Sequence, residues 1–361
     1  MKILDRYLIR QFLQVLLFGL VSLTIIFLLV NLIEQMDYFI DRHAKLLHVI
    51  EYYFFYVPEV LALVIPVAML LSTLFSLGVL SKHHEITAFK SSGTSLYRIL
   101  APIYLVALII SMAVILFNGY LVPYANQKKA EIKKTKFEKI SSAEQVQLID
   151  LFVQGDQGWI FHFKIYDPQL KQGTDGLFQR FEGEKLVEWL EAQKVIWKNP
   201  GWLLENGRVR VFEDTLLQPE KYQTFSSWVR YDLKAKPTLF SREQKTPDQM
   251  NLKELSSYIK LKKKSRKDVT KEVVDLYVLI SLSMLNFIIV FFGAPLAANP
   301  RRAGLAFNFG VTVIVGFIYY ILFKIGQSFG YNQKLSPWLS AWGGNIIFGI
   351  LGLGILFKAR K

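Results

Sequence analysis

The side chains that could do chemistry are few in this sequence, and they form no familiar catalytic pattern. His83 and His84 precede Glu85, but adjacent residues point to different sides of a helix, so the two imidazoles are not expected to share a metal ion. The chain has no cysteine, which excludes thiolate metal sites and disulfides. It also has no GxxxxGK(S/T) loop for nucleotide phosphates. The sequence therefore predicts no catalytic residue, metal or cofactor, and a protein that is not itself an enzyme.

The most informative polar segment is residues 81–95 (SKHHEITAFKSSGTS), which is too polar to enter a bilayer. Ile86 and Phe89 would give a short helix one apolar face, and Gly93 is a plausible helix stop. Such a helix either caps the longer helices that it joins or docks into a soluble partner such as a transport ATPase. The candidate contact residues are His84, Glu85, Ile86, Phe89 and Lys90.

Six long stretches without Asp, Glu, Lys or Arg must position these side chains. They are residues 11–33, 60–81, 99–127, 276–300, 303–323 and 335–357, each of 21 residues or more. About 20 apolar residues are enough to cross a bilayer as a helix. The first stretch is too long for the core of a signal peptide and is expected to remain as an anchor. The sequence therefore predicts an α-helical polytopic membrane protein with six transmembrane helices, three on either side of a polar insertion.

Lys and Arg are unevenly divided between the two sets of helix ends. With a cytoplasmic N-terminus, eleven of them fall at cytoplasmic ends and four in the opposite short loops, at Arg42, Lys45, Lys324 and Lys334. Because Lys and Arg are retained inside during insertion, both termini are expected in the cytoplasm. The spans contain almost no charge, which disfavours an ion-driven carrier and predicts that any energy source lies on another chain.

The insertion, residues 128–268, has strand patterns rather than spans. Apolar and polar residues alternate around Phe161, as in a half-buried strand. Asn199-Pro200-Gly201 and Asn206-Gly207 separate three further strand candidates, and Asn-Gly is a strong hairpin signal. Charged helix-compatible stretches, 128–140 and 251–264, lie at its two ends. The insertion is therefore expected to be an antiparallel β domain, either a sandwich or a jelly roll.

Basic clusters at 128–139 and 260–267 flank the β domain, in a chain with a net charge of +14. They could serve attraction to anionic lipid headgroups, or plain solvation. They could also contact an anionic lipid substrate as it leaves the membrane. Composition alone leaves both interpretations open.

The order of these motifs resembles the LptF/LptG family of lipopolysaccharide-export permeases over nearly the full length of the chain. The start of the chain is slightly more similar to LptG, although the other motifs are shared by both. The segments that carry the similarity are residues 3–7 (ILDRY), 57–59 (VPE), 65–67 (IPV), 77–80 (LGVL), 84–93 (HEITAFKSSG), 246–250 (TPDQM), 292–296 (FGAPL), 301–302 (RR) and 319–320 (YY).

This resemblance implies the permease subunit of an ABC transporter in the bacterial inner membrane. Such a subunit pairs with a second permease, LptF or LptG, and binds a dimer of the cytoplasmic ATPase LptB. Together they extract lipopolysaccharide from the membrane and pass it to periplasmic LptC and LptA. Membrane lipids are the other expected partners, and nucleic acid is not one. The coupling helix would be residues 82–95, which transmit the movement of the ATPase.

The resemblance also implies a layout in which residues 1–127 hold spans one to three, 128–268 form a periplasmic jelly-roll-like domain, and 269–361 hold spans four to six. Family members often carry basic residues in the outer half of the first span, and this chain departs from that pattern. The residues taken here as candidate substrate contacts are Asn31, Glu34, Arg42, Lys45, Lys128 and Lys129.

A second hypothesis remains beside the transporter. The chain could be a membrane-anchored periplasmic binding or scaffold protein, in which the six spans only hold the β domain. That hypothesis predicts normal function when the segment 81–95 is scrambled, and no cytoplasmic ATPase partner.

Overall fold

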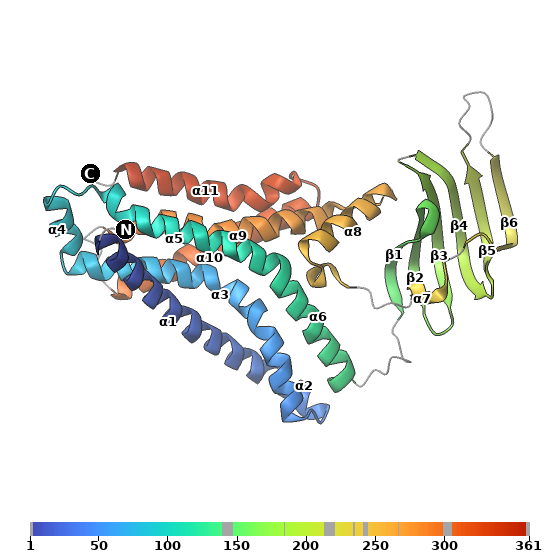
Figure 1. Cartoon of the computed structure of the whole chain (residues 1–361), viewed down its shortest axis with the longest axis horizontal. Coiled ribbons are helices and arrows are strands. Elements are labelled where there is room, and N and C mark those ends of the chain that lie inside the picture. The colour runs from blue at the N-terminus through green and yellow to red at the C-terminus, as the bar shows by residue number, and fades with distance from the viewer. Residues whose placement is uncertain are drawn as a thin grey trace. The chain divides into compact units, whose positions relative to one another are not determined.

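The computed structural model describes residues 3–138, 147–183, 185–212, 221–233, 235–240, 245–265, 267–298 and 305–358. The chain forms two compact units (Figure 1). The helical unit comprises Met1–Phe137, Pro247–Leu255 and Thr270–Lys361, and the β unit comprises Glu138–Thr246 and Ser256–Val269. Of the motifs above, Arg301 and Arg302 lie outside the described residues.

Within the described residues, six helices are long and apolar enough to cross a membrane, which confirms the predicted number. Two short helices, α2 (Met36–Asp41) and α4 (Glu85–Ser91), connect the first three of them. Pro58 and Pro66 lie inside the second long helix without ending it, because neighbouring helices in a membrane bundle can satisfy the freed backbone groups. The six are α1 (Ile3–Glu34), α3 (Leu46–Lys82), a continuous helix Leu96–Phe137 that begins with α5 (Leu96–Leu116), α9 (Thr270–Ala297), α10 (Leu305–Tyr331) and α11 (Pro337–Lys358).

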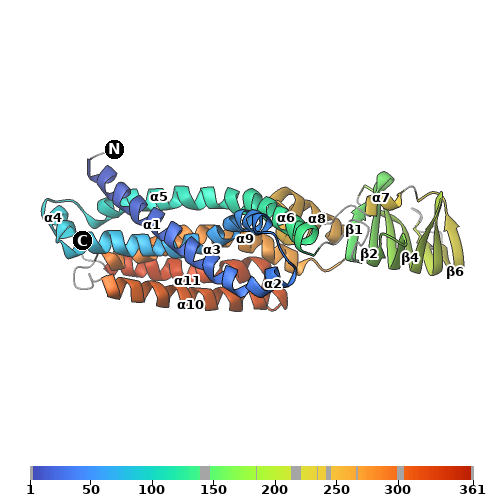
Figure 2. The ribbon, with the colours of Figure 1, turned by 90° about the horizontal axis from the view of Figure 1, so that it is seen from below.

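Helix α9 lies at the centre of this bundle. It packs against α11, α5 and α3, while α1 packs mainly on α3 and α10 lies beside α11 (Figure 1 and Figure 2). Leu70, Leu77, Ile103 and Val290 are among the side chains at the centre, each 1% exposed or less. The outer faces remain apolar because they meet lipid rather than water. Helices α1 and α10 are the least buried: 17% of the most apolar stretch of each is buried, against 56% for α3.

The third long helix contains two π-helical turns. After α5 come η1 (Phe117–Leu121), α6 (Val122–Ile132) and η2 (Lys133–Phe137), so the third long helix continues into the Lys-rich stretch that the sequence marks as helix-compatible. Gly119 of η1 allows Leu252, the first residue of α8 (Leu252–Lys264), to approach closely: a Cβ at this glycine would lie 2.4 Å from the Leu252 side chain. The Asn126 amide also donates a hydrogen bond to the carbonyl of Asp248 at 3.3 Å.

Six strands of the β unit form one antiparallel sheet in sequential order, which confirms an antiparallel β domain inserted between the third and fourth spans. Phe161 of β2, Phe178 of β3, Leu190 of β4 and Val209 of β5 are paired across the sheet, so they share one face, and all are buried. Phe240 of α7 (Pro237–Phe240) packs on this face. The strands are β1 (Leu148–Gln154), β2 (Trp159–Asp167), β3 (Gln172–Glu182), β4 (Lys185–Lys198), β5 (Gly201–Val211) and β6 (Lys221–Arg230).

A row of exposed residues crosses all six strands in register. Between every two neighbouring strands, the two residues of this row face each other but are missing from the regular antiparallel pairing. On alternate strands the row residue has a left-handed φ: 55° at Asp150, 48° at Asp175 and 49° at Asn206. The buried positions change phase there, so that Ala192 and Val195 of β4 are both buried, although they are three residues apart. We interpret the row as a crease along which one sheet bends around its core. Its members are Asp150, Lys164, Asp175, Gln193, Asn206 and Ser226.

This crease corrects one prediction. Asn199 and Pro200 do connect β4 to β5, as the sequence suggests. Asn206-Gly207 does not form a hairpin, because both residues lie inside β5, where Gly207 pairs with Ala192 and with Phe225. Asn-Gly favours a positive φ, and a crease needs that conformation as much as a hairpin turn does.

The predicted helix before the fourth span is α8. Its start is a reciprocal cap: the Asn251 side chain accepts hydrogen bonds from the N–H groups of Lys253 and Glu254, both at 3.0 Å. The Glu254 carboxylate in turn accepts the N–H of Asn251 at 3.0 Å. These bonds satisfy backbone donors that have no partner within the helix, and so they fix where α8 begins.

Candidate functional site

The predicted short helix in segment 81–95 is α4. Its two ends are set by left-handed residues, His84 with φ of 59° and Gly93 with φ of 85°. Ile86 is 2% exposed and Phe89 packs partly against the same apolar core, so one face of α4 is buried in the bundle as expected. His84 and Thr87 are exposed, whereas Glu85 and Lys90 are partly exposed. The helix therefore has a fixed apolar side and an accessible polar side.

Beside α4 the structure shows two contacts that the sequence did not predict. The Tyr7 hydroxyl of α1 donates a hydrogen bond to Glu85 Oε2 at 3.0 Å. Two guanidinium nitrogens of Arg98, in the first turn of α5, lie 2.9 and 3.0 Å from the two carboxylate oxygens of Asp5. Polar residues in the first turns of two apolar helices were the only local signal of these contacts.

At the other end of α1 and α3 the candidate substrate residues gather around an aromatic cluster. The Asn31 side chain accepts a hydrogen bond from the Tyr53 hydroxyl at 3.1 Å. The Arg42 guanidinium lies 4.0 Å from the ring centre of Tyr38, and the Lys129 ammonium 4.9 Å from that of Tyr56, both within cation–π range. The aromatic cluster, as this set is called below, consists of Tyr38, Phe39, Tyr52, Tyr53, Tyr56 and Phe137.

Some of the charged candidate residues are in ion pairs, and others are exposed. Lys129 forms an ion pair with Glu59, and Lys128 forms one with Glu131 at 2.9 Å. Glu34, Arg42 and Lys45 are exposed. The structure thus brings Asn31, Arg42 and Lys129 onto the aromatic cluster.

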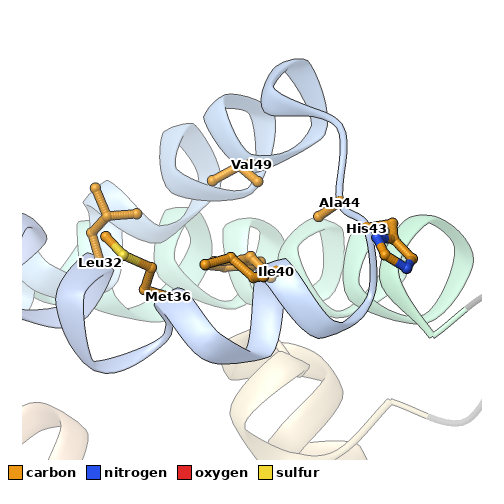
Figure 3. Close-up of a pocket in the computed structure, with 7 residues that line it drawn as sticks. Leu32, Met36, Ile40, His43, Ala44 and Val49 are labelled. Carbon is orange, nitrogen blue, oxygen red and sulfur yellow. The ribbon is translucent and has the colours of Figure 1, made fainter.

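An apolar hollow of about 180 Å³ lies at the bend formed by the end of α1, α2 and the start of α3 (Figure 3). Figure 3 shows Leu32, Met36 and Ile40 on one side, with Val49 opposite and His43 near Ala44. Phe39 also lines it and belongs to the aromatic cluster. No local pattern in the sequence indicates this hollow, because its walls come from three helices whose residues have no common spacing.

Comparison with known protein families identifies the family of this chain. The family described as lipopolysaccharide export system permease LptF/LptG matches residues 6–358. The chain belongs to the LptF/LptG family. No individual curated protein gives a significant match.

Membership in this family makes the chain an inner-membrane permease for lipopolysaccharide export, and a generally non-catalytic component of its transporter. The match covers LptF and LptG together. The resemblance drawn from the sequence motifs is therefore confirmed at the level of the family. Helix α4 lies within residues 84–93, one of the segments on which the resemblance rests.

Proposed function

We propose that this LptF/LptG chain is one of two permease subunits of an ABC transporter that extracts lipopolysaccharide from the inner membrane and delivers it to periplasmic bridge proteins. The observation that carries the proposal is the family match over residues 6–358, on a chain with six spans and an inserted β unit. Six spans form half of a cavity large enough for a lipid. A second LptF or LptG chain would complete it.

The energy would come from a cytoplasmic dimer of the ATPase LptB, which docks on α4. Two features support this: α4 has an anchored apolar side and an accessible polar side, and the middles of the spans contain few charges with which to bind a driving ion. Closure of the ATPase would push α4, and its buried Ile86 and partly buried Phe89 would pass that movement to the bundle. LptC and LptA would receive the lipid from the β unit.

The proposal also requires an orientation in which both termini and α4 are cytoplasmic and residues 128–268 are periplasmic. The distribution of Lys and Arg supports it. The chain has no native cysteine, so single cysteines report without background. Thr87→Cys on α4 should resist a membrane-impermeant maleimide in spheroplasts, while Lys221→Cys on β6 should react. The reverse labelling pattern would overturn the orientation.

The main test of ATPase coupling is Glu85→Ala. We expect the purified complex to lose about tenfold or more of its lipopolysaccharide-stimulated ATP hydrolysis, because an interfacial charge pair would be broken. The matched control is Glu51→Ala, which removes an exposed carboxylate from the opposite end of α3. A pull-down with the tagged chain should bring the ATPase with it.

The membrane-anchored scaffold predicts other results. It expects no ATPase in the pull-down and normal function after residues 81–95 are scrambled. Either outcome would favour the scaffold over the transporter. Unchanged lipid-stimulated ATP hydrolysis in Glu85→Ala would remove α4 as the docking element.

The aromatic cluster and its cationic neighbours are the proposed contact for the phosphorylated sugar head of the substrate. Arg42 and Lys45 are exposed, whereas the ammonium groups of Lys128 and Lys129 are in ion pairs. A photoreactive residue at Arg42 should therefore crosslink to lipopolysaccharide, whereas one at Lys82, at the other end of α3, should not. Equal crosslinking from both positions would contradict this assignment.

A further inference from the structure

The first contact that the proposed function leaves unused is between α1 and α4. Tyr7 lies in the second turn of α1 and Glu85 is the first residue of α4, 78 positions later. The phenol donates its hydrogen bond to Oε2 of the carboxylate at 3.0 Å. Hydrogen bonds to charged acceptors are stronger than those between neutral groups. The polar end of α4 is therefore attached directly to the first span.

A second contact attaches α1 to the segment that leaves α4. The chain turns at Gly93 and enters α5, whose first turn is capped by Ser95: its hydroxyl accepts the N–H of Arg98 at 3.3 Å. Two nitrogens of the Arg98 guanidinium contact the buried carboxylate of Asp5. Helix α1 is thus held at both sides of α4, by a phenol to its first residue and by an ion pair just beyond its end.

The rest of α1 is held differently. Leu8 and Phe12 are buried, and the hydroxyl of Ser72 donates to the carbonyl of Phe12 at 2.6 Å. Beyond this point large apolar residues face outward, such as Leu17, 65% exposed, and Phe18, 73% exposed. Figure 1 shows α1 starting beside α4 and running to α2 at the far end of α3. Helix α1 is therefore fastened at the end near α4, and its other half makes fewer packing contacts.

We infer that Tyr7 fastens α1 to α4 and that the Asp5–Arg98 pair fastens it to the start of α5, so that the first span moves together with α4 when the ATPase closes. This inference rests on the proposed function of α4. Tyr7 is a positioning residue: it acts through Glu85. A carboxylate has about four acceptor positions, so Glu85 can hold the phenol of Tyr7 and a cation of the ATPase at once. Movement of α4 would reach the aromatic cluster and the hollow through the length of α1.

The test is Tyr7→Phe, which removes the hydroxyl and keeps the ring. ATPase binding and the rate of ATP hydrolysis should stay within about twofold of wild type, while the amount of lipopolysaccharide released per ATP should fall by about three- to tenfold, the range of one typical intramolecular hydrogen bond. Tyr97→Phe, which removes a hydroxyl from the first turn of α5 at the same end of the bundle, is the matched control and should leave the ratio unchanged.

A double-mutant cycle separates this role from a general loss of packing. If Tyr7 acts through Glu85, then Tyr7→Phe should have no additional effect in a Glu85→Ala background, which has no side-chain acceptor for the phenol. Additive losses would assign Tyr7 a structural role and overturn the inference.

The ion pair has its own rescue experiment. Asp5→Arg and Arg98→Asp should each reduce the amount of lipid released per ATP, and the charge-swapped double variant should restore at least half of it. A swap that folds and binds the ATPase but shows no rescue would remove the ion pair from the inference.

Failure of the inference and failure of the proposed function give different results. If the wild-type chain binds no ATPase, the proposed function fails. If it binds the ATPase and Tyr7→Phe releases lipid at the wild-type ratio, then α4 is still the docking element but α1 is not fastened to it.

Discussion

The middles of the spans and the β unit both bury polar side chains, but they bury different kinds. In the middle of the spans the buried polar groups are neutral. Asn345 of α11 donates to the carbonyl and the hydroxyl of Ser281 at 2.8 and 2.9 Å, and its own oxygen accepts the Tyr319 hydroxyl at 3.0 Å. Ser281 in turn donates to the carbonyl of Ala341 at 2.6 Å. These four residues connect α9, α10 and α11 without any charge.

The β unit instead buries an ionic group. Arg230, at the end of β6, is 8% exposed and lies 2.6 Å from Glu188 of β4, which is 7% exposed. Its Nε donates to Asp232 at 2.6 Å, and hydrogen bonds from Arg230 hold the pKa of Asp232 below its ordinary value, against the opposing effect of partial burial. The rings of Trp159 and Trp228 lie 5.9 and 4.6 Å from the guanidinium carbon.

The difference follows from the solvent of each unit. A charge within a lipid-facing helix costs several kcal/mol, because the surrounding lipid offers no water to solvate it. A β domain in water can hold a buried charge when its partners are also charged and close, although that arrangement becomes very costly if one partner is lost. Neutral hydrogen bonds in the spans should therefore be individually replaceable, whereas the ionic group of the β unit should not be.

Removing Arg230 should have the largest effect. Arg230→Met leaves Glu188 buried without its main partner, and we expect the free energy of unfolding of the β unit to fall by about 3–5 kcal/mol. Hydrogen exchange of the strands β4 to β6, measured on the full chain in nanodiscs, reports this quantity.

Two further variants sharpen that result. Arg208→Met breaks an exposed ion pair with Glu191 and should change the same amides far less. Replacing both Arg230 and Glu188 by Met should recover much of the loss, because no buried charge then remains. Equal effects of Arg208→Met and Arg230→Met would contradict the claim that the β unit depends on a buried ionic group.

Removing Asn345 should have a smaller effect. Asn345→Ala deletes three hydrogen bonds, and such bonds between membrane helices average about 0.6 kcal/mol each, so the bundle should lose about 1–2 kcal/mol. Unfolding of the purified chain in mixed micelles measures it, with Ile346→Ala at the neighbouring position, 37% exposed, as the control. A loss as large as that of Arg230→Met would show that the neutral network is as costly to break as the ionic one.

The sequence predicted the parts of the fold that depend on composition and local spacing. The six spans follow from uninterrupted apolar stretches, and β2 follows from the alternation around Phe161. The crease was missed because its signal is ambiguous. Asp175-Gly176 and Asn206-Gly207 have the residues of hairpin turns, yet both pairs lie inside strands that are paired on either side. Only the pairing partners determine that the positive φ bends a sheet rather than reversing a strand.

The candidate site shows the same limit. Burial of Ile86 and Phe89 could be predicted because their spacing places both on one face of a short helix. The contacts Tyr7–Glu85 and Asp5–Arg98 join residues 78 and 93 positions apart, and no local pattern encodes which helices meet. The ion pair between Lys129 and Glu59 was likewise invisible, since each residue alone resembles a solvated charge at a helix end.

His162 gives the smallest expected effect on the stability of the β unit, because its side chain is buried and can still take up a proton. It is 5% exposed, its ring lies tilted against Phe152 with ring centres 4.2 Å apart, and its Nε2 lies 2.8 Å from Asp150 at the crease. Burial lowers the pKa of His162 below its ordinary value of 6.5, with Lys267 and Lys262 acting in the same direction and Asp150 opposing them.

The sign of the pH effect follows from that lowered pKa. The unfolded chain binds a proton near pH 6.5 while the folded β unit does so only at lower pH, so the unfolded state gains more protons as the solution is acidified. The stabilising contribution is complete above pH 6.5 and declines below it, and we expect a loss of about 1 kcal/mol or less between pH 7.5 and 5.5. Hydrogen exchange of β1 and β2, corrected for the intrinsic rate at each pH, measures it. His162→Gln keeps a hydrogen-bonding side chain without the titration and should flatten this dependence. If acidification instead stabilises β1 and β2, the attraction of Asp150 for protonated His162 outweighs the effect of burial. His162 would then resemble Arg230, a buried positive charge stabilised by its acidic partners.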